Sequence, residues 1–155
     1  MGRTYTSLTY HFVFSTKYRR KTIRPEFKEP LYQYIGGIIR KKNGVLLEIG
    51  GIEDHIHIMA GLPAAMSVSD MLRFIKANSS GWINETHKPR EEFAWQPGFG
   101  AFTVSHSQKP HVRDYIQNQE QHHRTQTFKE EFLAILVAHD ISYDPKFVFE
   151  EEHYG

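Results

Sequence analysis

The spacing of hydrophobic positions changes along the chain, and each change marks the border of an expected element. Residues 4–16 are rich in Thr, Tyr, Phe and Val, a composition that favours a pleated strand. Apolar residues at helical spacing follow and predict a helix that begins at Arg24–Pro25 and ends near Asn43–Gly44. Proline suits the first turn of a helix and Asn–Gly suits its end, so both borders have a physical reason.

The middle of the chain predicts a hairpin followed by a second helix. The apolar segments 45–49 and 55–60 are typical of short strands, and the loop between them contains two glycines and two acidic residues. Either Ser67 or Ser69 can cap a helix that runs to about Glu85 with its apolar side toward a core.

The last third of the chain predicts one more strand and two more helices. An aromatic-rich loop over residues 86–100 leads to a strand at about 101–105. A proline opens a helix over 110–124, and a last helix is expected at about 127–139. The acidic end, from about 143 to 155, is expected to be a flexible tail.

This order of elements, β-α-β-β-α-β with helices after it, predicts an α+β fold of the ferredoxin-like kind, which is also that of RNA-recognition domains. We expect an antiparallel sheet with helices on one face and a single domain over residues 1–155. The chain has no internal repeat and no clear linker that would divide it.

The composition excludes several classes of site. The chain has no Cys, which excludes thiolate metal sites, Cys nucleophiles and a disulfide framework. No apolar run reaches about 18 residues, so no membrane span is expected. The first residues lack the features of a secretion signal, and we expect a cytoplasmic protein.

The net charge of +1 hides an uneven distribution along the chain. Residues 1–42 hold ten Lys/Arg against two Glu, a balance of +8. Residues 43–100 hold four against seven acidic residues (−3), and residues 101–155 hold five against nine (−4). A basic first quarter predicts a patch for a polyanion such as nucleic acid, although charge alone leaves solvated surface charge equally open.

The segment His55-Ile56-His57 is the strongest candidate for a metal site. Alternate side chains of a strand share a face, so the two imidazoles project together while Ile56 and Ile58 enter a core. Histidine is a common metal ligand, but the bare motif is more often hydrogen-bonded or solvated. The apolar setting favours a metal site, in which Asp54 either orients a ligand or serves only as a turn residue.

Tyr115 and Gln119 are the candidate nucleophile and a candidate further ligand. They are four residues apart in the expected helix, so they share one helical face. A phenol can attack phosphorus, and an amide oxygen can bind a hard cation that polarises the phosphate. Taken alone, Tyr115 is more often a core or boundary aromatic residue.

Most other histidines are expected at the surface, because they lie late in a polar helix or near the ends of elements. These are His87, His106, His111, His122, His123, His139 and His153. No His-Glu-x-x-His or zinc-finger spacing is present, which excludes those two kinds of zinc site.

Taken together, these residues resemble the single-tyrosine HUH transposases of small bacterial and archaeal insertion sequences, whose close relatives are the REP-associated tyrosine transposases. HUH denotes His, a bulky apolar residue and His, here His55-Ile56-His57. The resemblance covers nearly the whole chain, in five segments that keep the family's order: 10–21, 50–63, 67–85, 93–105 and 112–132.

The resemblance implies a metal-dependent transposase that cleaves and rejoins single-stranded DNA through a 5′-phosphotyrosine link. Tyr115 would be the nucleophile, and the neutral side chains of His55, His57 and Gln119 would bind Mg²⁺ or Mn²⁺. The family implies a homodimer with joined sheets, in which the C-terminal catalytic helix with Tyr115 serves its own or the other subunit. No nucleotide cofactor is implied, because the covalent link retains the bond energy.

The DNA partner implied by the resemblance is single-stranded DNA with hairpin ends. The candidates for phosphate contacts are ten basic residues: Lys17, Arg19, Arg20, Lys21, Arg24, Arg40, Lys41, Lys42, Arg73 and Lys76. The motifs do not separate a mobile-element transposase from a host-owned relative, and the short chain favours the former.

Two other functions stay open at this point. A non-catalytic ferredoxin-like module that binds nucleic acid would leave the aligned His pair, Tyr115 and Gln119 unexplained. A small metal-dependent hydrolase would turn over its substrate without a covalent adduct to the protein.

Overall fold

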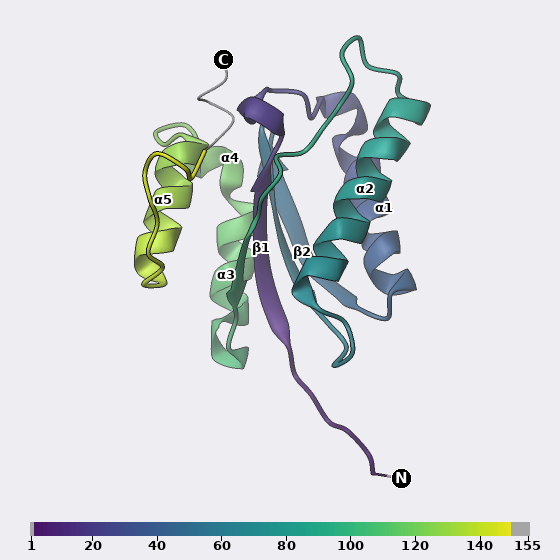
Figure 1. The fold of residues 1–155 in the computed structure, drawn as a ribbon, viewed down its shortest axis with the longest axis vertical. Helices are drawn as coiled ribbons and strands as arrows, with labels where there is room; N and C mark the ends of the chain where they lie inside the picture. The colour runs from purple at the N-terminus through teal and green to yellow at the C-terminus, as the bar shows by residue number, and fades with distance from the viewer. Residues whose placement is uncertain (1, 150–155) are drawn as a thin grey trace.

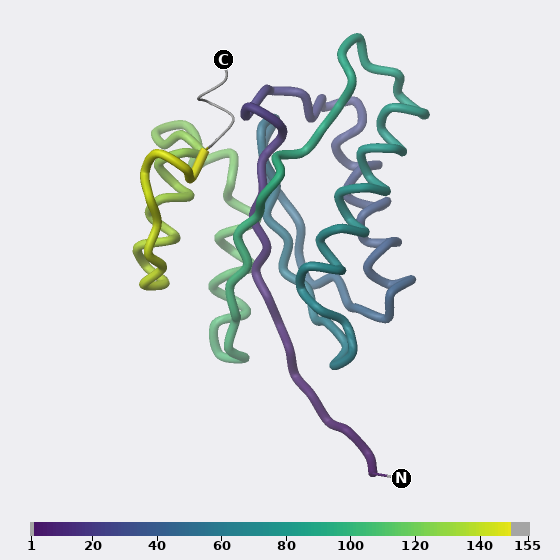
Figure 2. Tube along the Cα trace, in the orientation of Figure 1, coloured from purple at the N-terminus to yellow at the C-terminus, as the bar shows by residue number. Residues whose placement is uncertain are grey.

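The computed structural model describes residues 2–149, and Figures 1 and 2 show their arrangement. Four strands form one antiparallel sheet in the order β2-β3-β1-β4. Their bounds are Thr9–Ser15 for β1, Val45–Ile52 for β2, His55–Gly61 for β3 and Gly100–Thr103 for β4. The sheet and the order of its elements are those predicted for a ferredoxin-like α+β fold.

One face of the sheet is covered by the two long helices, α1 (Pro25–Lys41) and α2 (Val68–Thr86), as Figure 1 shows. Side chains alternate along β1, so Phe12 and Phe14 point to this face and are fully buried among apolar residues of both helices. Each such side chain contributes about 1.5–3 kcal/mol by its burial. This face therefore forms the main apolar core.

The second face is covered by the C-terminal helices, so the expectation of helices on one face only was wrong (Figure 1). These helices are α3 (Lys109–Gln117), α4 (Gln119–His122) and α5 (Phe128–Ala138), and two short 3-10 helices are η1 (Lys17–Arg19) and η2 (His106–Gln108). Val13 of β1 and Phe102 of β4 lie on this face, and Phe132 of α5 packs in the same apolar cluster. Because such a patch must be covered, the sheet takes a second layer of helices.

Two helices begin where the sequence provides a cap. The Ser67 side chain accepts a hydrogen bond from the Asp70 N–H at 3.1 Å, so Ser67 caps α2. Thr127 and Glu130 form a capping box at the start of α5. Both caps define the residue at which a helix begins.

The helix expected over 110–124 is divided at Asn118. Its φ and ψ angles of −100° and 21° leave the helical range, so α3 ends at Gln117 and α4 starts at Gln119. Tyr115 and Gln119 therefore do not share one continuous helical face. Their side chains lie close together because both contact the same third residue, which is described with the site below.

The crossing of α3 over β2 requires Gly50. A Cβ atom at this position would lie 2.7 Å from the carbonyl oxygen of Ile116, closer than real Cβ contacts. The glycine lets α3 lie directly on the sheet, and this brings Tyr115, the neighbour of Ile116, beside His57 of β3.

No helix within residues 2–149 has the length and apolar character needed to cross a bilayer. Phe149, in the segment expected to be a flexible tail, is buried in the apolar cluster of the second face. Residues 150–155 of that segment lie outside the described part of the chain.

Candidate active site

His55 and His57 lie at the start of β3 and point to the second face of the sheet, as the alternation of a strand predicts. They pair with Ser15 and Val13 of β1, and both His side chains are fully buried. Their Nε2 atoms lie 3.3 and 3.0 Å from the same atom, Oε1 of Glu131. The two imidazoles therefore converge on one point between β3 and α5.

The Nδ1 atoms of both rings are engaged as well. Nδ1 of His55 is 2.7 Å from Oδ1 of Asp54, and its N–H donates to that carboxylate. Nδ1 of His57 is 2.8 Å from Nε2 of His11, a buried residue of β1 that was not among the expected site residues. Such partners fix the orientation of metal-binding imidazoles, and here they leave both Nε2 atoms directed toward Glu131.

Glu131 is the centre of the site and was not expected there. It is 1% exposed, and its Oε2 accepts hydrogen bonds from Nε2 of Gln119, at 2.9 Å, and from the Tyr115 hydroxyl. Along α5 it lies between Phe128 and Phe132, on the buried side of the helix. The sequence does contain a signal for this residue, which is an acidic side chain within the apolar stripe of a helix. A buried carboxylate needs polar partners, so such a residue is a candidate for a site.

His123, expected at the surface, is buried in this cluster, so that expectation was wrong. Its side chain is 3% exposed, and its Nε2 lies 3.2 Å from Oε1 of Glu131 and 3.2 Å from Oε1 of Gln119. Its Nδ1 donates to the carbonyl of Gln126 at 2.6 Å. The turn between α4 and α5 folds back over the site, and local periodicity does not reveal such a turn.

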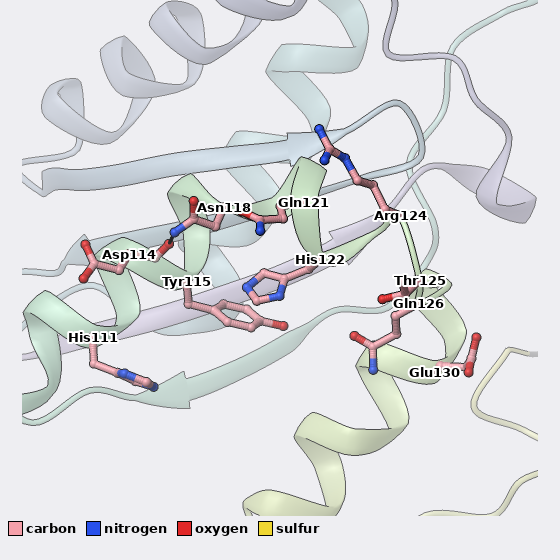
Figure 3. A pocket seen from close by; sticks show the side chains of 10 residues that line it. All are labelled: His111, Asp114, Tyr115, Asn118, Gln121, His122, Arg124, Thr125, Gln126 and Glu130. Carbon is pink, nitrogen blue, oxygen red and sulfur yellow. Dashed lines mark hydrogen bonds between the residues drawn. The ribbon is translucent and has the colours of Figure 1, made fainter.

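Tyr115 contacts this buried cluster and also lines an open cleft. Its ring centre is 5.6 Å from that of His57 and 4.8 Å from that of His122. The Tyr115 and His122 rings lie side by side (Figure 3). Both residues line an open cleft of about 900 Å³, together with His111 and Arg124. Within the single chain described, the Tyr115 ring lies beside the His pair.

Burial and neighbouring charges shift the pKa values of the site in different directions. Burial opposes the charge of His55, but hydrogen bonds to Asp54 and Glu131 outweigh it and raise the pKa to about 9. Burial prevails at His57 and lowers its pKa. Burial also opposes the charge of Glu131, yet its bonds to the two His hold the pKa of that carboxyl well below its usual range. Burial and the Glu131 carboxylate raise the pKa of Tyr115, so the hydroxyl keeps its proton at neutral pH.

The donor atoms of the site suit a divalent cation. One nitrogen of His55, one of His57 and one oxygen of Glu131 all lie within 4.8 Å of one another, so this buried group can bind a metal ion. The amide oxygen of Gln119, the expected third ligand, lies 2.8 Å from Nε2 of His55. Imidazole and carboxylate donors together suit Mn²⁺, and oxygen donors suit Mg²⁺. The expected donor set was neutral, whereas the structure adds one negative charge.

Comparisons with known proteins identify the family. Residues 4–119 match the family model described as "Transposase IS200 like". The transposase for insertion sequence element IS200 from Salmonella typhimurium is 32% identical over 128 residues, which cover 77% of this chain and 81% of the relative. The chain belongs to the IS200-like transposase family. The corresponding IS200 transposase of Salmonella typhi matches to the same extent.

The family match confirms the resemblance to single-tyrosine transposases that the motifs of this IS200-like transposase indicated. Two solved structures share its fold. One, assigned as a transposase, is from Deinococcus radiodurans R1, with a TM-score of 0.61 and 23% identity over 77% of this chain and 96% of that chain. The other is a REP-associated tyrosine transposase bound to a REP hairpin, with a TM-score of 0.59 and 20% identity. That match covers 79% of this chain and 73% of the other.

The ten basic residues expected to contact DNA form two separate groups in the transposase. The first group lies in and after the turn that follows β1, at the end of the sheet where Ser15 pairs with His55: Lys17, Arg19, Arg20, Lys21 and Arg24. The second group lies on α1, just after it, and on α2, which cover the opposite face: Arg40, Lys41, Lys42, Arg73 and Lys76. Only the first group is near the His pair.

Local contacts already engage some members of the second group. The Lys42 amino group lies 3.9 Å from the centre of the Phe74 ring. Lys76 donates to the carbonyls of Gln96 and Gly98, at 2.9 and 2.5 Å, and burial lowers its pKa to about 8. Lys76 thus ties the loop after α2 to the helix in this structure.

Proposed function

We propose that this IS200-like transposase cleaves and rejoins single-stranded DNA, with Tyr115 as the nucleophile. One observation carries the proposal: the Tyr115 hydroxyl and the Nε2 atoms of both His55 and His57 contact the same carboxylate. A phenol is a poor nucleophile at neutral pH, and a raised pKa makes it poorer. The phenol therefore needs activation, and a metal ion bound beside the hydroxyl would provide it.

The proposed reaction is a transesterification. The Tyr115 oxygen forms a bond to phosphorus while the bond between phosphorus and the 3′ oxygen breaks, which leaves a 5′-phosphotyrosine link. The phenol proton ends on the released 3′-OH, so the step consumes neither water nor a nucleotide. Attack of a 3′-OH on the link rejoins the DNA and restores the phenol.

The ion that we propose is Mg²⁺ or Mn²⁺. His55 and His57 would bind it through Nε2, because Asp54 and His11 engage the other nitrogens. Gln119 is proposed as a further oxygen ligand from α4. When bound, the ion would polarise the scissile phosphate and balance the charge on the leaving oxygen.

The substrate that we propose is single-stranded DNA with hairpin ends, and the protein would act as a homodimer. A structure that shares this fold is bound to a REP hairpin. The basic turn, with Lys17 and Lys21, lies at the His55 end of the sheet, where it would contact backbone phosphates. The cleft beside Tyr115 would receive the strand that is cut.

An adduct assay tests this function. The transposase is incubated with Mn²⁺ and single-stranded DNA that carries a hairpin, and the covalent adduct is mapped by mass spectrometry. Tyr115→Phe should abolish the adduct while DNA binding persists, and EDTA should stop cleavage by the wild type. A wild-type level of adduct in Tyr115→Phe would contradict the assignment. Turnover without an adduct would indicate a hydrolase, and binding without cleavage would indicate a DNA-binding module.

A further inference from the structure

We propose that Glu131 is a catalytic residue that couples the nucleophile to the metal site, an inference that rests on the proposed function. One carboxylate oxygen, Oε1, would join His55 and His57 as a ligand of the ion. The other oxygen, Oε2, holds the Tyr115 hydroxyl. The position of Tyr115 would therefore depend on whether the ion is bound.

The two oxygens of Glu131 face different parts of the site. Oε1 lies 3.0 Å from Nε2 of His57 and 3.3 Å from Nε2 of His55. Oε2 accepts from the Tyr115 hydroxyl and, at 2.9 Å, from Nε2 of Gln119. One carboxylate therefore joins the candidate ligands to the candidate nucleophile without any intervening side chain.

The burial of Glu131 argues against a role in packing alone. The residue is 1% exposed, and its neighbours on the buried side of α5 are Phe128 and Phe132. Taking an ionised carboxylate out of water is costly, and an apolar side chain of similar size often stabilises a protein as well or better. A charge at this buried position therefore favours a function in the site.

Glu131 also differs from the other carboxylate at the site. Asp54 contacts His55 at Nδ1, the nitrogen that faces away from the shared point, so it can orient the ring only. Within residues 2–149, the group that can hold a metal consists of the two His and Glu131. Glu131 lies outside residues 4–119, the part of the chain that matches the IS200-like family model.

Glu131→Gln tests the coupling because it removes the charge and keeps the shape. Glu130→Gln is the matched control, since it makes the same change one residue earlier on α5, where glutamine can keep the capping box. Two quantities are measured without DNA: the Mg²⁺ affinity by calorimetry, and the NMR signal of the Tyr115 ring in protein made with ¹³C-labelled tyrosine. The Tyr115 signal is the one of eight that is missing from Tyr115→Phe.

The expected results separate the two variants. In the wild type, Mg²⁺ should shift the Tyr115 signal, because the ion would bind the same carboxylate that accepts the hydrogen bond of the Tyr115 hydroxyl. In Glu131→Gln, the Mg²⁺ affinity should fall about 10- to 100-fold, and saturating Mg²⁺ should leave the Tyr115 signal in place. Glu130→Gln should match the wild type in both measurements.

The coupling would be overturned if Glu131→Gln bound Mg²⁺ with wild-type affinity and its Tyr115 signal shifted on Mg²⁺ binding as in the wild type. It would also be overturned if Glu130→Gln lost as much Mg²⁺ affinity as Glu131→Gln. If Glu131→Gln does not fold, Glu131→Asp provides the test, because it keeps the charge on a shorter side chain. It should bind Mg²⁺ and lose the Tyr115 shift, and a retained shift would overturn the proposal. These measurements need no DNA, so a wild type that forms no adduct would contradict the proposed function alone.

Discussion

The two faces of the sheet differ in what they bury, and β3 contributes to both. Ile56 and Ile58 point to the face under α1 and α2, whose cluster of buried residues is apolar. His55 and His57 point to the face under α3, α4 and α5, where they meet the buried carboxylate of Glu131. The alternation of one strand thus supplies apolar side chains to the core on one side and the candidate metal ligands on the other. The difference predicts that substitutions on the first face change folding, whereas substitutions on the second change metal binding.

Phe12→Ala, on the first face, should have the largest effect on stability. Phe12 is fully buried, and its loss leaves a cavity, so the free energy of unfolding should fall by about 3–5 kcal/mol. Urea denaturation with and without Mg²⁺ measures this, and the extra stability conferred by Mg²⁺ should equal that of the wild type. If the free energy of unfolding fell only in the presence of Mg²⁺, the two faces would not be independent.

The pH should affect the second face through His55. Its pKa of about 9 in the folded protein lies above the ordinary value of about 6.5, so the folded state holds a proton that the unfolded state releases. This stabilisation is complete below pH 6.5 and is lost as the pH rises through 9. The metal-free protein should therefore melt at a lower temperature at pH 9 than at pH 6.5. Bound Mg²⁺ takes the place of the proton and should reduce this fall.

Thermal unfolding between pH 6.5 and 9, with and without Mg²⁺, measures this effect. His55→Gln should lose the fall that starts at pH 6.5, whereas His106→Gln, a change at an exposed position, should keep it. The window starts at pH 6.5 because the lowered pKa values of His57 and His11 act in the opposite direction at lower pH. The same fall in His55→Gln would place the titration at another residue.

His11→Ala should weaken metal binding about tenfold, with a smaller effect on stability than Phe12→Ala. When Nε2 of His57 binds an ion, its Nδ1 must carry the hydrogen and donate it to His11, which lies 2.8 Å away. His11→Gln should recover part of the affinity, because the amide oxygen can accept this hydrogen bond. Titration with Mn²⁺, followed by electron paramagnetic resonance, provides the affinities. Equal affinities in wild type and His11→Ala would show that β3 alone orients His57.

The first face could be predicted from the sequence because its signals are local. The stripes of α1 and α2 repeat every three or four residues, and Pro25 and the Ser67 cap mark where the two helices begin. On the second face, alternation also places His55 beside His57, because the two residues are in one strand. Periodicity cannot show that Glu131, 74 residues from His57, folds back onto that strand. The sequence therefore predicted the half of the site that lies in one strand, whereas the carboxylate that joins it to Tyr115 depends on the turn before α5.

The smallest effect that separates the faces should come from two helix caps. Thr127→Ala removes a cap from α5 and Ser67→Ala removes one from α2, so each should cost about 1 kcal/mol of stability. Thr127 begins the helix turn that carries Glu131, and the Mg²⁺ affinity should fall in Thr127→Ala because that turn frays. Ser67→Ala should leave the affinity unchanged, since α2 covers the other face. Denaturation and calorimetry on both variants compare the two. An equal fall in affinity in both would mean that metal binding follows global stability, and the two faces would then act as one unit.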